Sequence, residues 1–291
     1  MASYLVFDIG ATSVKYSRMN EEAQISFFDQ FSSEGKDGYY ILEEIKRVIL
    51  AGKDEVRGIA ISSTGLINSA EGRIIKSGGF PDLQGLNVKR WINEFIPDLK
   101  VTIENDGNCS VFAEKWLGKA KHLDHFVCIS IGSAIGGGIY INGKLYRGRE
   151  FLTGEFGSIL TQAMPGSPTL NSVSGMKGLR RRYSAYVGKE LRDISGEDLF
   201  NKYGQGDYGL DRIVLDFYGG LALFISNLNH MMNPEKFIIN GGITKSETFL
   251  PMLTSQLKLY GYEDLDSILL SPFKNKANLV GALYYHLSQT Q

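Results

Sequence analysis

Cysteine is scarce in this chain, with only Cys109 and Cys128 among 291 residues. Two cysteines exclude a disulfide framework and suit a reducing compartment, so we expect a cytoplasmic protein. Residues 1–8 have neither the charged start nor the apolar core of an export signal. No apolar run approaches the roughly 20 residues that a membrane-spanning helix needs, so we expect no membrane partner.

The chain also has little excess charge of either sign. Its formal net charge is −1, with 31 Lys and Arg against 32 Asp and Glu. Without a basic excess, electrostatics gives no reason to expect a nucleic-acid partner. Hydrophobic residues make up 43% and charged residues 22%, which is typical of a globular protein long enough for two domains.

Glycine, in contrast, is abundant and clustered, and the clusters reveal a repeat. "YLVFDIGATSVKYSRMNEEAQI" starts at Tyr4, and "FVCISIGSAIGGGIYINGKLY" starts at Phe126. In each stretch an apolar strand ends in Ile-Gly followed by small residues, and a second strand and a turn come next; Asn142-Gly143 is a strong hairpin signal. Two copies so far apart predict two similar lobes.

These glycine turns have two possible roles. Glycine lets backbone N–H groups approach an anion closely, and Thr12 and Ser133 would add a hydroxyl donor at matching places. Lys15 would add a positive charge beside the first turn. Each turn alone could equally be an ordinary hairpin with glycine at positive φ. The duplication favours a polyphosphate ligand, although neither copy fits the P-loop pattern or the dinucleotide fingerprint.

Asp8 ends the first strand of the repeat, where the second copy has Ser130. A carboxylate beside a phosphate-binding turn is a natural partner for hydrated Mg²⁺. The alternative is an aspartate that only caps the turn.

A second carboxylate lies in "VTIENDGNCSVFAEKWLGKA", residues 101–120, where a strand passes into a helix at Asp106. Asp106 could cap this helix or act as a catalytic base, and both roles are compatible with a helix N-terminus. The order of strands and helices along the chain predicts a mixed α/β fold.

Taken in order, the motifs resemble those of the ROK family, sugar kinases and regulators within the actin-like ATPase superfamily. The resemblance spans nearly the whole chain and includes the segments "DIGATSVK" (8–15), "STG" (63–65), "ENDGN" (104–108), "IGSAIGGGIYINGKLYRG" (131–148), "GEFGS" (154–158) and "NGGI" (240–243). It implies two actin-like (ribonuclease H-like) ATPase lobes with a central cleft. The expected lobes are residues 1–117 with 275–291, and residues 118–274, the second including a dimerisation surface.

The resemblance also implies roles for individual residues. Asp106 would be the catalytic base, and sugar would be bound by Asn105, Asp106 and Glu155, together with Gly65 and Gly79. Asp8 would hold Mg²⁺ directly or through water. The ATP site would consist of Gly10, Thr12, Lys15, Gly132, Ser133, Gly241 and Gly242. ATP and Mg²⁺ are therefore the expected cofactors, and a homodimer is the expected assembly.

One feature departs from the family pattern. Many members bind structural zinc through a histidine after Gly-Glu-x-Gly and three cysteines. Here that histidine position is Ser158, and the segment after it has no cysteine, so we expect no structural zinc site. A sugar-contacting glutamate of the family would fall near Leu170 or Asn171. Zinc-free members include kinases of β-glucosides.

The sequence therefore predicts an ATP-dependent sugar kinase that transfers the γ-phosphate to a hydroxyl, preferably the 6-hydroxyl, of a hexose or a glucosyl disaccharide. The main alternative is a sugar-binding regulator without kinase activity. A third possibility is an actin-like filament or chaperone ATPase, which the compact length and the Asn105-Asp106 pair disfavour.

Overall fold

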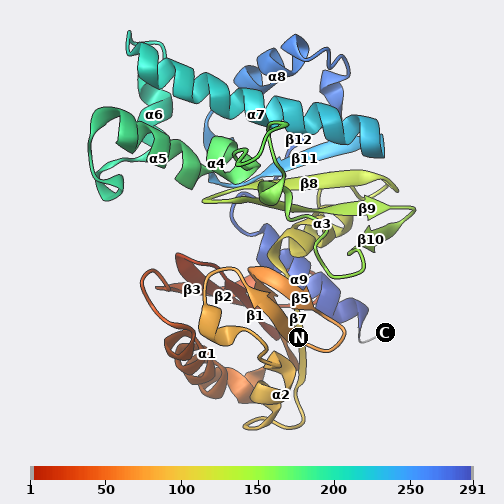
Figure 1. Cartoon of the computed structure of the whole chain (residues 1–291). Helices are drawn as coiled ribbons and strands as arrows, with labels where there is room; N and C mark the ends of the chain where they lie inside the picture. The colour runs from red at the N-terminus through yellow and green to blue at the C-terminus, as the bar shows by residue number, and fades with distance from the viewer. Residues whose placement is uncertain (1–2, 290–291) are drawn as a thin grey trace. The chain divides into compact units, whose positions relative to one another are not determined.

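A computed structural model describes residues 3–289 and divides the chain into two compact units. The first unit comprises Met1–His122, Arg147–Leu152 and Lys276–Gln291, and the second comprises Leu123–Tyr146 and Thr153–Asn275. The chain thus leaves the second unit for the six residues Arg147–Leu152 before it returns. Figure 1 shows the elements of both units.

The first unit is built on a five-stranded sheet in the order β3-β2-β1-β4-β7. Strands β1 to β3 form an antiparallel meander, whereas β1, β4 and β7 run parallel. All six residues of β1 and of β4 are buried, as expected for strands covered on both faces. The strands are β1 (Tyr4–Ile9), β2 (Ser13–Met19), β3 (Ile25–Ser32), β4 (Gly58–Ser63) and β7 (Lys100–Asn105), and a separate hairpin is formed by β5 (Gly65–Asn68) and β6 (Arg73–Ser77).

Helices pack against this sheet, and strand alternation decides which side chains meet them. Leu5, Phe7 and Ile9 of β1 join the apolar core that includes Ile41 and Ile45 of α1. The intervening side chains point to the opposite face, which α9 covers. The helices of this unit are α1 (Gly38–Gly52), α2 (Val88–Asn93), α3 (Asp106–Trp116) and α9 (Ala277–Ser288).

The second unit repeats this topology. Its sheet has the order β10-β9-β8-β11-β12, with an antiparallel β8–β9–β10 meander and parallel β8, β11 and β12. The predicted turn at Asn142-Gly143 is confirmed, because both residues have positive φ, 51° and 70°. The predicted structural repeat is therefore present. Its strands are β8 (Phe126–Ile131), β9 (Ile135–Ile141), β10 (Lys144–Tyr146), β11 (Lys236–Asn240) and β12 (Ile268–Leu270).

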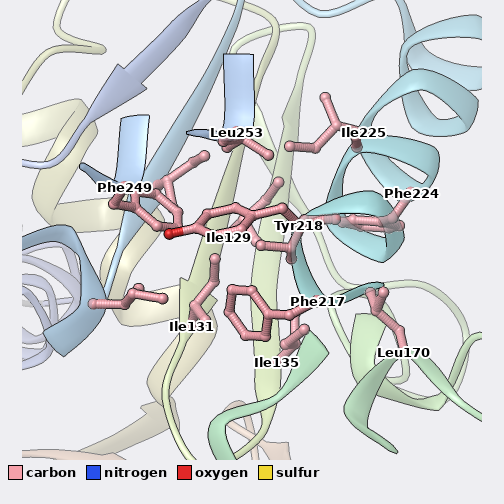
Figure 2. Packing of buried hydrophobic residues seen from close by; sticks show 14 of the residues in the cluster. Ile129, Ile131, Ile135, Leu170, Phe217, Tyr218, Phe224, Ile225, Phe249 and Leu253 are labelled. Carbon is pink, nitrogen blue, oxygen red and sulfur yellow. The ribbon is translucent and has the colours of Figure 1, made fainter. Parts of the chain in front are cut away.

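The long helix α7 provides much of the core of this unit. Figure 2 shows Phe217 and Tyr218 of α7 among Ile129 of β8 and Phe249 and Leu253 of α8. Burying such a side chain is worth about 1.5–3 kcal/mol, so this cluster fixes the helices on the sheet. The helices are α4 (Leu170–Ser174), α5 (Met176–Val187), α6 (Gly196–Lys202), α7 (Tyr208–Met232) and α8 (Phe249–Leu259).

Short 3₁₀ turns connect several of these elements. They are η1 (Lys53–Glu55), η2 (Pro81–Leu83), η3 (Phe156–Ser158), η4 (Leu191–Asp193), η5 (Gly242–Lys245) and η6 (Leu265–Ser267). Within residues 3–289, no helix is both long and apolar enough to cross a membrane.

Candidate active site

A row of polar residues crosses the sheet of the first unit. Lys15 of β2 lies opposite Asp8 of β1, Asp8 lies opposite Ser62 of β4, and Ser62 lies opposite Glu104 of β7. Because partners in register point to the same face of a sheet, the four side chains form one line. They lie near the carboxyl ends of the parallel strands, where open α/β sheets place their ligand sites.

Asp8 is only 4% exposed, and hydrogen bonds to both of its carboxylate oxygens hold it in this row. Its Oδ2 accepts a hydrogen bond from Lys15 Nζ at 3.1 Å, and its Oδ1 accepts from Ser62 Oγ at 3.0 Å. Asn278 Nδ2, at the start of α9, donates to the same Oδ1 at 3.1 Å. Asn278 could not be predicted from the sequence, because nothing local links it to a residue 270 positions earlier.

The turn after β1 exposes two backbone donors. Gly10 N–H donates to Ser13 O at 3.1 Å, while Ser33 occupies the carbonyls of Gly10 and Thr12 through its Oγ at 2.7 Å and its N–H at 3.2 Å. Ala11 and Thr12 are exposed, and their N–H groups bond to no acceptor among residues 3–289. Adjacent backbone N–H groups of a turn that have no acceptor are the kind of group that can bind an anion.

The turn after β8 also exposes two backbone N–H groups, but different residues bond to its carbonyls. Gly132 N–H donates to Ala134 O at 2.9 Å. The carbonyls of Gly132 and Ser133 accept, at 3.1 Å each, from the N–H groups of Met176 and Lys177, the first two residues of α5. Ser133 and Ala134 are exposed, and in the described part of the chain their N–H groups have no bonded acceptor. The glycine turn of each unit therefore presents two adjacent N–H groups without an acceptor among the described residues.

Gly241 and Gly242 follow β11, directly beside the end of β8. Gly241 has φ of 114°, and a Cβ there would lie 2.0 Å from Ile131 O, so only glycine lets these two strand ends approach so closely. A Cβ on Gly242 would meet no atom within 4 Å. The predicted nucleotide residues of this unit, Gly132, Ser133, Gly241 and Gly242, therefore lie together, and Gly242 borders open space.

Asp106 opens α3, but it is not the residue that caps the helix. The N-cap is Asn105, whose Oδ1 accepts from Asn108 N–H at 3.0 Å. Asp106 Oδ1 accepts from Gly107 N–H at 2.8 Å and from Asn105 Nδ2 at 3.1 Å. This half-buried carboxylate therefore lies in the first turn, where the helix dipole favours negative charge.

Of the two glycines predicted on the sugar side, Gly65 contacts Asn105, and Gly79 borders the turn after β1. Asn105 Nδ2 donates to Gly65 O at 2.9 Å. A Cβ on Gly79 would lie 3.3 Å from Ala11 Cβ, so the Gly78-Gly79 segment borders the turn after β1. In this unit the predicted sugar, base and phosphate residues thus form one continuous region.

Glu155, predicted to contact sugar, belongs to the second unit. Gly154, just before it, has φ of 95°, and a Cβ there would lie 2.1 Å from Gly137 O. The glycine-rich sequence of β9 therefore lets the backbone before Glu155 lie directly against the strand. This close approach fixes the direction in which the chain presents Glu155, which is half-buried.

Cys109 also lies near this region, but its chemistry is unsuited to nucleophilic attack. Burial raises the pKa of its thiol well above the ordinary value, and the neighbouring negative charge of Glu104 raises it further. The thiol therefore stays protonated near neutral pH, and we assign it a packing role.

A model of the ROK family matches residues 4–289. The chain belongs to the ROK family. Among curated ROK relatives, a β-glucoside kinase of Listeria monocytogenes is 39% identical, with 97% of both chains covered. A β-glucoside kinase of Klebsiella pneumoniae is 34% identical, covering 96% of this chain and 94% of that protein.

Solved ROK structures share the fold. The Lmo2764 protein of Listeria monocytogenes, provisionally described as an N-acetylmannosamine kinase, superposes with a TM-score of 0.93 at 36% identity, covering 99% and 100% of the two chains. A Streptomyces griseus glucokinase solved with glucose and AMPPNP gives 0.82 at 20% identity, covering 97% and 98%. The predicted family and the predicted actin-like α/β fold are confirmed.

The segment that carries zinc in many ROK proteins is held here by hydrogen bonds. Residues 149–175 contain the 3₁₀ turn η3, one isolated bridge between Leu160 and Thr169, and the helix α4. Thr169 caps α4, a signal that the sequence analysis overlooked. Gln162 N–H donates to Ser167 Oγ at 2.8 Å, which closes the hairpin.

The residues near the expected sugar-contacting glutamate have other contacts. Leu170 is buried in the core, and Asn171 Oδ1 accepts from Ile135 N–H at 2.6 Å. Ile135 begins β9, so Asn171 steadies the turn that presents Ser133. Asn171 therefore supports the turn at Gly132–Ala134, which is predicted to bind phosphate.

Proposed function

We propose that this protein phosphorylates the 6-hydroxyl of the glucosyl unit in β-glucosides such as cellobiose, with ATP as the donor. The broader prediction, an ATP-dependent carbohydrate kinase, is confirmed by the curated β-glucoside kinases that match over nearly the full length. The regulator alternative is less well supported by these relatives.

One observation carries the proposal for the site. In both copies of one supersecondary unit, the first strand is followed by a turn with two exposed N–H groups that have no acceptor in the described part of the chain, and the turn after β1 lies against Gly79. Gly78, the neighbour of Gly79, approaches Gly65, whose carbonyl accepts from Asn105. Amides that point outward without acceptors suit phosphate oxygens. We assign the turns at Gly10–Thr12 and Gly132–Ala134 to the phosphates of ATP, and Gly241 and Gly242 to the adenosine.

Asp106 is the proposed base. Phosphoryl transfer depends mainly on positioning and charge neutralisation, because little covalent chemistry is asked of the protein. In this scheme the sugar oxygen attacks the γ-phosphorus, its proton passes to Asp106, and ADP leaves. Asn105 fixes the carboxylate by its hydrogen bond to Oδ1, and Asn105, Glu155, Gly65 and Gly79 would bind the sugar.

Asp8 fits a Mg²⁺ site in which water mediates the contact. Its Oδ1 accepts from two donors, and its Oδ2 pairs with the ammonium of Lys15, which supports a surrounding that accommodates positive charge. Mg²⁺ usually keeps several of its waters, and a fixed carboxylate can hold one of them. When bound, the ion would neutralise charge on the phosphates of ATP.

The substrate class rests on the curated relatives and on the missing zinc ligands. The sequence lacks the cysteines of the Cys₃His site, so sugar contacts that depend on it cannot be made. The β-glucoside kinases from Listeria and Klebsiella are 34–39% identical. A cytoplasmic homodimer remains our prediction for the assembly and its location.

A coupled assay of ADP release over a sugar panel tests the proposal. The panel comprises cellobiose, glucose, mannose, fructose, N-acetylmannosamine and sucrose, each with ATP and Mg²⁺. We expect the highest kcat/KM for cellobiose. Preference for N-acetylmannosamine would contradict the substrate assignment, and sugar-independent ADP release would support a different ATPase. Sugar binding without any turnover would support the regulator.

A further inference from the structure

Glu104 is a buried carboxylate whose two oxygens serve different partners. It lies on β7 just before Asn105 and is 0% exposed. Its Oε1 accepts from Asn105 N–H at 2.8 Å and from Asn108 Nδ2 at 2.9 Å. Its Oε2 accepts from Arg147 Nε at 3.1 Å and Nη2 at 2.6 Å. One oxygen thus holds the junction of β7 and α3, where the proposed base lies, and the other accepts from Arg147.

The contacts continue from Glu104 to Asp106. Asn105, whose N–H is fixed by Glu104, caps α3 and donates through Nδ2 to Asp106 Oδ1 at 3.1 Å. Asn108, the other partner of Glu104, donates its N–H to Asn105 Oδ1 at 3.0 Å. The conformation of Asn105 is therefore fixed at both its backbone and its side chain by groups that depend on Glu104.

Arg147 reaches Glu104 from an unusual place in the chain. It begins the segment Arg147–Leu152, which belongs to the first unit although both flanking segments belong to the second. Its guanidinium lies 5.9 Å from the ring centre of Phe112 on α3 and 5.8 Å from that of Tyr285 on α9. Two aromatic rings and a carboxylate hold it in place, so it contacts α3, α9 and the end of β7 together.

We propose that Arg147 is a positioning residue for phosphoryl transfer, which acts through Glu104 to set the Asn105–Asp106 pair. The inference rests on the proposed function. Without the guanidinium, Glu104 Oε2 loses both of its donors, and a buried carboxylate without donors turns toward other ones. Asn105 and Asn108 then lose their common acceptor, and the carboxylate of Asp106 loses its fixed direction.

The expected consequence is a loss of turnover without a loss of binding. Displacing a catalytic group by about 1 Å can cost roughly 100-fold in rate. We therefore expect kcat of Arg147→Met to fall roughly 10- to 100-fold, while KM for cellobiose and for ATP stays within about twofold. Arg147→Lys supplies one charged donor and should recover part of kcat, because lysine cannot match the two-donor contact.

Arg149→Met is the matched control. Arg149 lies in the same segment, its side chain is 93% exposed, and its ion pair is with the exposed Glu150 at 3.7 Å. This variant should keep the kcat and KM of the wild type. All variants are assayed at temperatures well below their thermal unfolding midpoints, so that a loss of stability does not lower the measured kcat. If Arg147→Met does not fold, Arg147→Lys decides: a wild-type kcat would overturn the inference.

An NMR measurement separates this inference from the proposed function. The side-chain amide signals of Asn108 should move in Arg147→Met and stay in place in Arg149→Met. An active wild type, with unmoved signals and normal kcat in Arg147→Met, overturns the inference and leaves the function standing. If the wild type is inactive but the Asn108 signals of Arg147→Met differ from those of the wild type, the proposed function is overturned and the contact from Arg147 through Glu104 is supported. A fall in kcat that is accompanied by a similar rise in both KM values indicates general loosening and overturns the inference.

Discussion

His286 lies on α9 with a fully buried imidazole, and acidification should destabilise the first unit through this side chain. Its Nδ1 lies 3.0 Å from Thr102 Oγ1 on β7. Burial, with a smaller contribution from the charge of Lys100, lowers its pKa from 6.5 to about 4. The folded protein therefore disfavours the imidazolium, which an unfolded chain accepts freely below about pH 6.5.

The sign and size of the effect follow from proton linkage. Below about pH 6.5 the imidazole binds a proton in the unfolded chain but stays neutral in the folded chain. The free energy of unfolding is therefore highest above that pH and declines toward pH 4. Between about pH 7.5 and about pH 5, the two pKa values give a loss of about 2 kcal/mol in the free energy of unfolding. That loss is roughly 30-fold in the unfolding equilibrium constant.

Urea unfolding followed by tryptophan fluorescence measures this loss, because Trp91 and Trp116 both belong to the first unit. His286→Gln removes the titrating group, and His122→Gln is a control at an exposed histidine. The wild type and His122→Gln should lose about 2 kcal/mol more than His286→Gln over this pH range. Equal pH dependence in all three proteins would refute the reasoning.

Three further predictions concern the proposed ligand sites. Gly154→Ala, whose Cβ would lie 2.1 Å from Gly137 O, should raise the KM for sugar at least about tenfold, and an unchanged KM would remove Glu155 from the sugar site. Gly241→Ala should lower the unfolding midpoint through strain at φ of 114°. Gly242→Ala, in open space, should keep that midpoint and raise the KM for ATP. Equal midpoints for the two variants, or an unchanged KM for Gly242→Ala, would contradict this prediction. Asp8→Asn should raise the Mg²⁺ concentration needed for half-maximal rate, and an unchanged Mg²⁺ dependence would exclude the metal role.

The parts of the site that could be predicted are those encoded by neighbouring residues. The two glycine turns were recognisable because a strand, a glycine and a small hydroxyl residue follow one another at Gly10–Thr12 and again at Gly132–Ser133. The strand-to-helix junction at Asp106 was visible for the same reason. Each of these signals depends on local backbone geometry, which short sequence patterns describe well.

The unpredicted parts depend on packing between distant segments. Asn278 contacts Asp8 because α9 returns to the first sheet, and Arg147 contacts Glu104 across 43 positions. Local competition also mattered, since Asn105 and not Asp106 caps α3. On α5, Arg180 donates to the carbonyls of Ile194 and Leu191, which lie more than ten positions away in the sequence. Residue type alone gave no sign of these partners.

Turnover of Asp106→Asn with ATP, Mg²⁺ and cellobiose tests the central claim most directly. The substitution keeps the size of the side chain and removes its ability to accept the proton of the sugar. We expect kcat to fall roughly 10²- to 10⁴-fold, with the Kd for sugar within about threefold of the wild type, and normal kinetics for the exposed control Asp98→Asn. A near wild-type rate in Asp106→Asn would contradict the account.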